Sequence, residues 1–172
     1  MEVFEAILAL GANLGNPEDT FKKALKFIER DIGEILAVSR YYITAPLNPP
    51  DIKEQNDFLN AALSCRTSLP PKKLLTTVLD IEEKLGRKRE ESVKWGPRVI
   101  DIDIISIDNL IINEPGLSVP HPELHHRDFV LVPLKEIKPD FIHPELGLTV
   151  DEMLDALNKQ GSQLFVKKSL SR

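Results

Sequence analysis

The most constraining feature of this chain is a short segment in which isoleucine and aspartate alternate, from Ile100 through Asp101, Ile102 and Asp103 to Ile104. Because side chains alternate between the two faces of a β-strand, the isoleucines face a core and the aspartates share the other face. Two strand steps separate the carboxylates by roughly 6–7 Å, where ionised groups repel unless a cation lies between them. The segment predicts a strand with one apolar face and a pair of acids on the other.

The residues before this strand favour a phosphate-binding metal site over two solvated surface acids. Gly96 and Pro97 predict a turn, Arg98 supplies a permanent positive charge, and residues 87–89 are all basic. Magnesium ions that bridge phosphates take carboxylate ligands, and arginine binds phosphate oxygens. A calcium loop of the EF-hand type is excluded, because serine 106 and isoleucine 112 replace the glycine and glutamate that it needs.

Length and composition predict one globular domain over residues 1–172. Hydrophobic residues make up 42% and charged residues 28% of the chain, which suffices for a core without disulfides or a structural metal. A single cysteine, Cys65, and the lack of an early apolar segment flanked by positive charge predict a cytoplasmic location. The apolar runs are shorter than the roughly 20 residues of a membrane span.

The charge distribution favours a small anionic ligand over a nucleic acid. The formal net charge is −5, which disfavours a general nucleic-acid binder. Positive charge is nevertheless concentrated in one segment that contains Lys84, Arg87, Lys88, Arg89, Lys94 and Arg98. We therefore expect small-molecule substrates, with no nucleic acid, membrane or obligate protein partner.

The N-terminal third predicts a central strand followed by a capped helix. Residues 3–10 are almost continuously apolar, as in a strand covered on both faces. Residues 11–15 predict a tight turn at the edge of a site, but they match neither the Walker nor the dinucleotide-binding glycine pattern. Asn16 is placed to cap a helix with Pro17 in its first turn, and the helix has a buried stripe of Phe21, Ala24, Leu25 and Ile28.

The next third predicts two further strands and a second helix. Residues 35–44 have strand character, and the proline-rich residues 45–56 predict a loop that is functional or disordered. In the strand over residues 58–66, Phe58 and Asn60 share one face, where a ring and an amide can bind a flat heterocycle. The alternative is that Phe58 is a core residue and Asn60 closes the loop.

A helix is predicted from Pro70 and Pro71 to a stop at Gly86, with Leu74, Val78, Ile81 and Leu85 at helical spacing. Glu82 lies beside this stripe, either at the rim of the core or as an ordinary surface residue. Residues 86–97 lack hydrophobic periodicity and predict a loop. Its arginines could close over phosphates, or they could form a solvated charge run.

The C-terminal third predicts short elements around a rim. Residues 110–113 predict a hairpin strand, 119–122 an extended rim, 127–134 a short helix or turn, and 164–166 an edge strand. His121 could contact phosphate, transfer a proton or form a turn. A zinc site at His125 and His126 is disfavoured, because adjacent residues do not share a helix face and no cysteine is near. Thr149 should cap a last helix with Leu154 and Leu157 buried.

The element order strand, helix, strand, strand, helix, strand predicts an α+β fold of the ferredoxin-like type. Such a fold has an antiparallel sheet with helices packed on one face.

Several ordered motifs resemble those of one enzyme family. The segment Trp95-Gly96-Pro97-Arg98, followed by Asp101 and Asp103, resembles the signature of the hydroxymethyl-dihydropterin pyrophosphokinases of folate biosynthesis. The likeness extends from residues 8–15 to residues 119–122 and 127–131. The resemblance implies a ferredoxin-like core with added C-terminal elements. It also implies transfer of pyrophosphate from ATP to the hydroxymethyl group of a reduced pterin, with release of AMP.

The resemblance assigns roles to individual residues. It implies that Asp101 and Asp103 hold two Mg²⁺ ions and that Arg87 and Arg89 close onto the phosphates. The residues implied at the pterin are Thr44, Ala45, Leu47, Phe58, Asn60, Trp95 and Phe129. Those implied at ATP are Glu82, Arg89, Trp95, Arg98, Ile104, Ser118, His121 and Arg127.

This sequence departs from the best-known bacterial pattern at three positions. Phe58 stands where a tyrosine is common, and Gly116 and Pro122 stand where some members place an arginine and a tyrosine near ATP. The first change conserves a stacking surface, and the other two alter the expected ATP contacts.

Two alternatives share the two-acid pattern. Palm-type nucleotidyl transferases and cyclases also set two acids on a ferredoxin-like sheet, but their substrates would not explain Phe58, Asn60 and Phe129 together. A non-catalytic ligand-binding domain of the same fold would not need Asp101 and Asp103 beside so much arginine.

Overall fold

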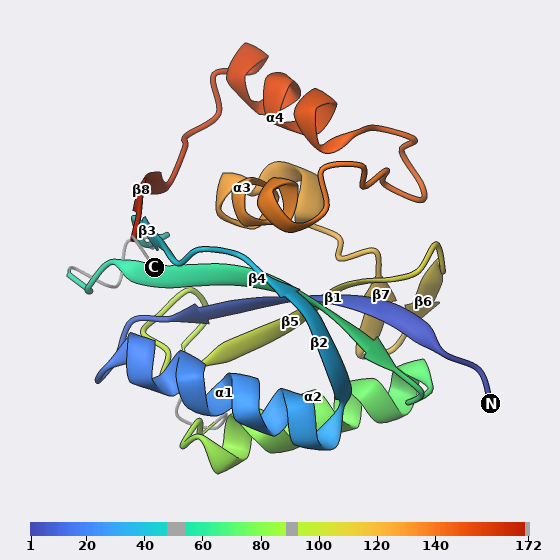
Figure 1. Cartoon of the computed structure of the whole chain (residues 1–172). Coiled ribbons are helices and arrows are strands. Elements are labelled where there is room, and N and C mark those ends of the chain that lie inside the picture. The colour runs from blue at the N-terminus through green and yellow to red at the C-terminus, as the bar shows by residue number, and fades with distance from the viewer. Residues whose placement is uncertain (48–53, 89–92, 171–172) are drawn as a thin grey trace.

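The first apolar run of the chain forms the central strand, β1 (Phe4–Ala12). It pairs antiparallel with β4 (Phe58–Thr67) on one side and with β5 (Asp101–Ile107) on the other. The sheet order is β5-β1-β4-β3-β8, and β2 also pairs with β4 (Figure 1). The central position predicted for this run is therefore confirmed. The computed structural model describes residues 1–47, 54–88 and 93–170.

The remaining strands are short and lie at the edges. They are β2 (Gly33–Val38), β3 (Tyr42–Thr44) and β8 (Val166–Ser169) in the main sheet, and β6 (Ile112–Glu114) and β7 (Leu117–Val119) in a separate ribbon. The single strand predicted over residues 35–44 is broken, because the hydroxyl of Ser39 takes over the local pairing by accepting the Ala62 N–H at 2.9 Å. The strands predicted at 110–113 and 164–166 begin about two residues later than expected.

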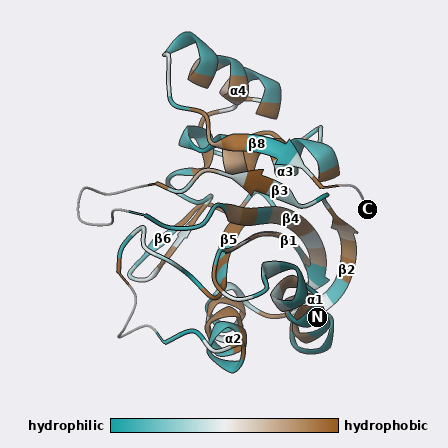
Figure 2. Cartoon of the chain, turned by 90° about the vertical axis from the view of Figure 1, so that its left-hand side faces the viewer, coloured by the Kyte–Doolittle hydropathy of each residue, from teal (hydrophilic) through white to brown (hydrophobic). Residues whose placement is uncertain are grey.

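Two helices cover one face of the sheet, α1 (Pro17–Asp31) and α2 (Pro71–Lys84) (Figure 1). Asn16 caps α1 as predicted, with its side chain accepting the Asp19 N–H at 3.2 Å. The apolar stripes of both helices meet the sheet residues Leu8, Leu63 and Ile102 in one core. Figure 2 shows the outer sides of these helices in hydrophilic colours.

The opposite face is covered by α3 (Asp128–Ile137) and α4 (Val150–Lys159), with the 3-10 turn η2 (Leu124–His126) beside them. The two helices of the predicted pattern, α1 and α2, share one face, and α3 and α4 add a layer on the other face that the pattern itself did not include. This layer covers the second apolar face of the central strands, where Ile7 and Ile105 form a second core with Leu131 and Met153. Thr149 begins α4 with a capping box, as predicted.

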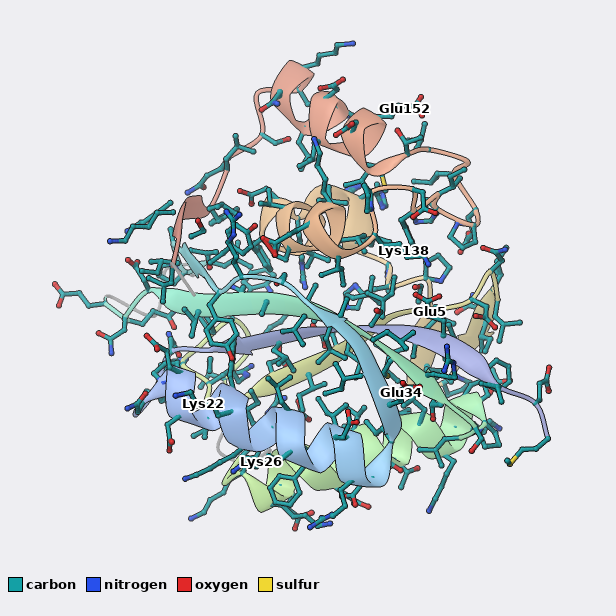
Figure 3. The ribbon with its side chains drawn as sticks, in the orientation of Figure 1. Glu5, Lys22, Lys26, Glu34, Lys138 and Glu152 are labelled. Atoms are coloured by element: carbon teal, nitrogen blue, oxygen red, sulfur yellow. The ribbon has the colours of Figure 1, made fainter. Side chains whose placement is uncertain are left out.

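An ion pair also ties the second layer to the sheet. Nζ of Lys138, at the end of α3, lies 3.0 Å from Oε1 of Glu5 on β1 (Figure 3). In the part of the chain that the structure describes, no helix has the length and apolarity of a bilayer-spanning segment.

The alternating segment forms β5 with the predicted orientation. Ile102 and Ile104 are buried in the core with α1 and α2, and Asp101 and Asp103 face the side of α3. Ile105 continues the face of Asp101 and Asp103 and reaches the second core. A register shift opposite Ile7 and Leu8 then changes the alternation, so that Ile107 lies in the first core instead.

Gly33→Ala is expected to destabilise the fold by about 1–3 kcal/mol, because the added methyl group has no room. An ideal Cβ at Gly33 would lie 2.0 Å from the backbone oxygen of Arg66 on β4, which cannot move without breaking the sheet pairing. The free energy of unfolding in urea measures the effect.

Glu34→Ala is the matched control, because it changes the next residue of β2 without adding bulk. It removes an exposed ion pair between Glu34 and Arg66, whose charged atoms lie 2.7 Å apart, and such pairs contribute about 0–1 kcal/mol. Equal unfolding free energies for Gly33→Ala and the parent would contradict the close approach.

Candidate active site

An open cavity lies on the α3 side of the sheet, over β1, β4 and β5. Its volume is about 750 Å³ including the open mouth. It is lined by every residue that the family resemblance implies at the pterin: Thr44, Ala45, Leu47, Phe58, Asn60, Trp95 and Phe129. The structure brings these together with Arg98, Asp101, Asp103 and Arg127.

Other predicted residues do not line this cavity. Ile104 is buried in the core on the opposite face of the sheet, and Ser118 lies on β7. Glu82 and Arg87 line a second hollow beside the end of α2. Arg89 and residues 48–53 of the proline-rich loop lie outside the described residues.

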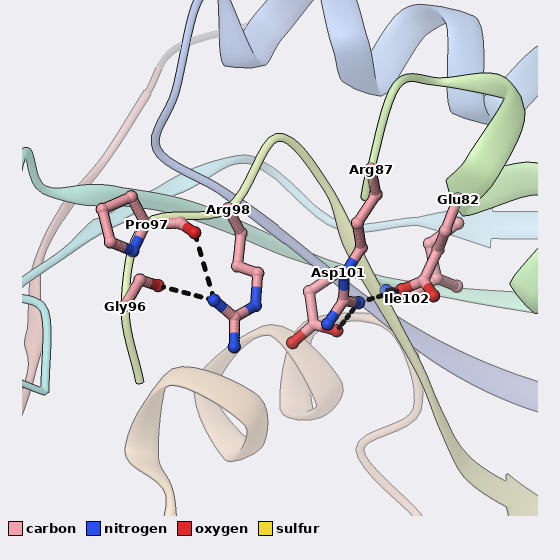
Figure 4. Close-up of polar contacts among 7 residues, drawn as sticks. All are labelled: Glu82, Arg87, Gly96, Pro97, Arg98, Asp101 and Ile102. Atoms are coloured by element: carbon pink, nitrogen blue, oxygen red, sulfur yellow. Dashed lines mark hydrogen bonds and ion pairs between the residues drawn. The ribbon is translucent and has the colours of Figure 1, made fainter. Parts of the chain in front are cut away.

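Glu82 is a buried anchor for the acidic strand. Its side chain is 2% exposed, and its Oε2 accepts the backbone N–H of Ile102 at 2.8 Å. The same oxygen accepts Nη1 of Arg87 at 2.7 Å, and this nitrogen also lies 2.8 Å from Oδ1 of Asp101 (Figure 4). Burial lowers the pKa of Arg87, but the carboxylates of Glu82 and Asp101 raise it by more, so the guanidinium keeps its charge.

Asp103 ionises with more difficulty than an ordinary aspartate. Burial, and next the charge of Asp101, raise the pKa of Asp103 to about 7, although Arg127 and Arg87 act in the opposite direction. Two carboxylates that compete for charge in this way form a site that a bound cation would stabilise.

The turn before β5 is held by hydrogen bonds from the Arg98 side chain to the backbone. Nη1 of Arg98 donates to the carbonyl oxygens of Gly96 and Pro97 at 3.2 and 3.1 Å (Figure 4). Trp95 has a φ of 62° and stays 47% exposed at the mouth of the cavity, with Lys94 over its ring at 4.7 Å. This turn therefore presents an aromatic surface and a cation side by side.

Asn13 is a structural residue of the site that the sequence analysis did not find. It is 3% exposed, its Oδ1 accepts the Arg98 N–H at 2.8 Å, and its Nδ2 donates to Gln55 and to the backbone of Asn56. It thus joins the turn after β1 to two other loops. The only sign of this role in the sequence was an asparagine next to a glycine-rich turn. Its hydrogen-bond partners could not be predicted, because they lie 42 to 85 residues away in the sequence.

Gly11 makes room for the amide of Asn60. A Cβ at Gly11 would lie 3.0 Å from Oδ1 of Asn60, tighter than an ordinary contact. Nδ2 of Asn60 donates to Oγ1 of Thr44 at 2.6 Å, which fixes the amide in the cavity wall. Gly11 and Ala12 belong to β1, so the turn predicted over residues 11–15 begins later, and it is the end of the strand at Gly11 that lines the cavity.

The histidines are held by their own local turns. Nδ1 of His121 accepts the Glu123 N–H at 3.1 Å, and burial followed by the charge of Arg127 lowers the pKa of His121. His125 and His126 have their ring centroids 3.8 Å apart. Within the described ranges, no group of three or more histidine, cysteine, aspartate or glutamate side chains is arranged for a metal ion.

Paired carboxylates, arginines and aromatic walls around one cavity are the features expected of an enzyme that transfers phosphorus-containing groups to a flat substrate. Comparison with known proteins identifies the family. The family model for 7,8-dihydro-6-hydroxymethylpterin-pyrophosphokinase matches residues 7–139. The chain belongs to this family, and it is an ATP-dependent pyrophosphokinase of folate biosynthesis.

Two named relatives support the assignment. The chain is 37% identical over 154 residues to the 2-amino-4-hydroxy-6-hydroxymethyldihydropteridine pyrophosphokinase of Synechocystis sp., covering 89% of this chain and 76% of the relative. It is 41% identical over 146 residues to the folic acid synthesis protein FOL1 of Dictyostelium discoideum, covering 85% of this chain. It spans only 21% of that longer protein.

A solved structure shares the fold. The crystal structure of wild-type HPPK-DHPS from Plasmodium falciparum with pteroate has a TM-score of 0.75 and 17% sequence identity to this chain. The match covers 98% of this chain and 47% of the Plasmodium chain.

Asp103→Asn is expected to raise the stability of the metal-free protein at pH 8 but not at pH 4. The folded pKa of about 7 exceeds the ordinary value of about 3.9 for an unfolded chain. The stability that Asp103 contributes is therefore full below pH ~4 and is lost as the pH rises to about 7, because the unfolded chain releases its proton first. Urea unfolding in EDTA across this window measures the difference.

Asp155→Asn is the control, since it removes an exposed carboxylate from α4. Its stability should follow that of the parent across the same pH values. A stability advantage of Asp103→Asn that does not grow between pH 5 and pH 8 would contradict the raised pKa.

Proposed function

We propose that the cavity binds a reduced hydroxymethylpterin beside the triphosphate of ATP, and that the pterin hydroxyl attacks the β-phosphorus. The observation that carries this proposal is the position of Asp101 and Asp103 in the same cavity as Phe58, Asn60 and Phe129. Neither a simple metal site nor a simple aromatic pocket requires both sets of residues together.

At the pterin end, two rings and an amide provide complementary surfaces. Phe58 and Phe129 come from β4 and α3, on different walls of the cavity, and can stack on the two faces of a planar heterocycle. Asn60 offers an amide for the edge of the ring, fixed by its bond to Thr44. Thr44, Ala45, Leu47 and Trp95 complete this end.

At the phosphate end, Asp101 and Asp103 are the proposed ligands of two Mg²⁺ ions. This pair of carboxylates suits Mg²⁺, because the ion is commonly held by one or two carboxylates together with substrate phosphates. When bound, the ions supply charge neutralisation for the phosphate oxygens and lower the pKa of the attacking hydroxyl.

The arginines provide the remaining positive charge. Arg87 is expected to exchange Asp101 for a phosphate oxygen when nucleotide binds, while Glu82 keeps its hold on the guanidinium. Arg89 would join it there, and Arg98, His121 and Arg127 would complete the anion site. Glu82, Trp95 and Ser118 would line the nucleotide, with Gly116 and Pro122 changing the contacts on that side. The side chain of Ile104, which is buried in the core, would not reach it.

The fold that carries this site is proposed to be ferredoxin-like with added C-terminal elements. The order β5-β1-β4-β2, with α1 and α2 on one face, supports that proposal. In the same proposal, α3, α4 and β8 are the additions.

The bond of ATP that breaks provides the test. Attack at the γ-phosphorus releases ADP and attack at the α-phosphorus releases pyrophosphate, whereas attack at the β-phosphorus releases AMP. Phosphorus NMR should therefore show AMP and a pterin-bound pyrophosphate rising in equal amounts, only with both Mg²⁺ and reduced pterin present.

Asp101→Asn is the matched inactive variant, because it keeps the size of the side chain and removes a proposed metal ligand. It should fold like the parent and form neither product. ADP, cyclic AMP or free pyrophosphate as the stoichiometric product would refute the proposal, and the last two would favour a cyclase or nucleotidyl transferase instead.

Phe58→Ala is expected to weaken pterin binding, whereas Phe58→Tyr should bind like the parent. Stacking on an aromatic side chain contributes about 1–3 kcal/mol for nucleic-acid bases, and tyrosine keeps the ring. Calorimetry of reduced pterin binding measures both variants. Parent-like affinity for Phe58→Ala would mean that Phe58 does not stack on the pterin.

A further inference from the structure

A C-terminal segment outside the family match lies against the proposed pterin pocket. Residues 165–169, here named the brace, follow α4 and include β8, whereas the family model ends at residue 139. The brace pairs antiparallel with β3, with Val166 opposite Thr44 (Figure 1). It thus reaches the strand that supplies Thr44 to the cavity wall and that leads directly into Ala45.

The first contact of the brace is with a buried carboxylate at the start of α3. Oδ2 of Asp128 accepts the backbone N–H groups of Phe165 and Val166, both at 2.8 Å. Asp128 is 4% exposed and lies between Arg127 and Phe129, two residues that line the cavity. Its position in the first turn of α3 also suits a negative charge.

The second contact is between two aromatic rings. The ring of Phe165 meets that of Phe129 at a centroid distance of 5.8 Å and an interplanar angle of 87°, which is a favourable edge-to-face arrangement. Phe165 is half-buried and does not line the cavity itself. It therefore acts on the pocket through Phe129.

The third contact joins the opposite wall. The backbone oxygen of Phe165 accepts the N–H of Ala45 at 2.8 Å. One residue therefore contacts both the strand end at Ala45 and the helix start at Phe129. Because the N–H of Ala45 already donates this hydrogen bond, a bound pterin would have to form its hydrogen bonds with other backbone groups of this segment.

We propose that Phe165 and Asp128 are positioning residues that hold Phe129 and the Thr44–Ala45 backbone at the separation needed for a pterin ring. This inference rests on the proposed function of the cavity. It adds a determinant of pterin affinity from a part of the chain that lies outside the family match.

Calorimetric titration of the full chain tests it, with reduced hydroxymethylpterin and with α,β-methylene-ATP plus Mg²⁺. Phe165→Ala should weaken pterin binding roughly two- to tenfold, the range that corresponds to one lost aromatic pair, and leave nucleotide binding unchanged. In turnover assays the KM for pterin should rise while kcat at saturating pterin holds.

Three variants sharpen the test. Leu164→Ala changes the preceding side chain, which is 51% exposed, and Phe165→Tyr keeps the ring, so both should bind pterin like the parent. Asp128→Ala should weaken pterin binding as Phe165→Ala does. Because both act through the same contact, the double variant should lose less than the sum of the single losses.

The outcomes separate the inference from the proposed function. If Phe165→Ala binds pterin like the parent while Phe129→Ala binds it more weakly, the positioning role of the brace is wrong and the proposed pterin pocket still stands. An equal loss of pterin and nucleotide affinity in Phe165→Ala would also overturn it, because it would show a general structural role. If the parent does not bind pterin, or if Phe129→Ala binds it like the parent, both the proposed pterin pocket and the positioning role of the brace are wrong.

Discussion

One buried carboxylate sets the geometry on which the site depends. Glu82 is almost completely buried, and a buried charge is tolerated only when it is paired and hydrogen-bonded. Its pairing with Arg87 and with the Ile102 N–H fixes the end of α2, the loop that follows it and the start of β5 at one point. Asp101 shares the same guanidinium. The acidic pair is therefore positioned from the side of the core.

The second constraint is a sheet whose central strands are apolar on both faces. One face is closed by α1 and α2, but α3 and α4 cover only part of the other. The cavity occupies the part of that face where the polar and aromatic residues of β4 and β5 lie beside the end of β1. Because Arg127 and Phe129 come from the start of α3, the same layer that covers the second core also supplies two walls of the site.

Local patterns predicted much of this arrangement. The alternation around Asp101 gave the direction of both acids, and the same periodicity placed Phe58 and Asn60 on one face, because the two-residue repeat of the strand backbone alone decides which way a strand residue points. Long-range pairings were not predictable in this way. The sequence placed Glu82 at the rim of the core or on the surface, whereas it is buried and accepts a hydrogen bond from the Ile102 N–H. Asn13 and Asp128 form hydrogen bonds with residues far along the chain, and no periodicity in the sequence indicates these partners. The assigned site roles, including that of Arg89 outside the described residues, remain predictions.

The charges at the phosphate end have a common consequence for the proposed reaction. In the structure the two acids are stabilised differently, Asp101 by Arg87 and Asp103 by a proton, since burial and the charge of Asp101 raise the pKa of Asp103 to about 7. Arg87 stays anchored by Glu82, so its guanidinium can turn to a phosphate without leaving the site. Nucleotide would thus give Arg87 a new anionic partner just as Asp101 becomes available as a ligand. In the proposed reaction the acids and the arginine would therefore be coupled, and the phosphates would favour occupation of the metal site whose charge they balance.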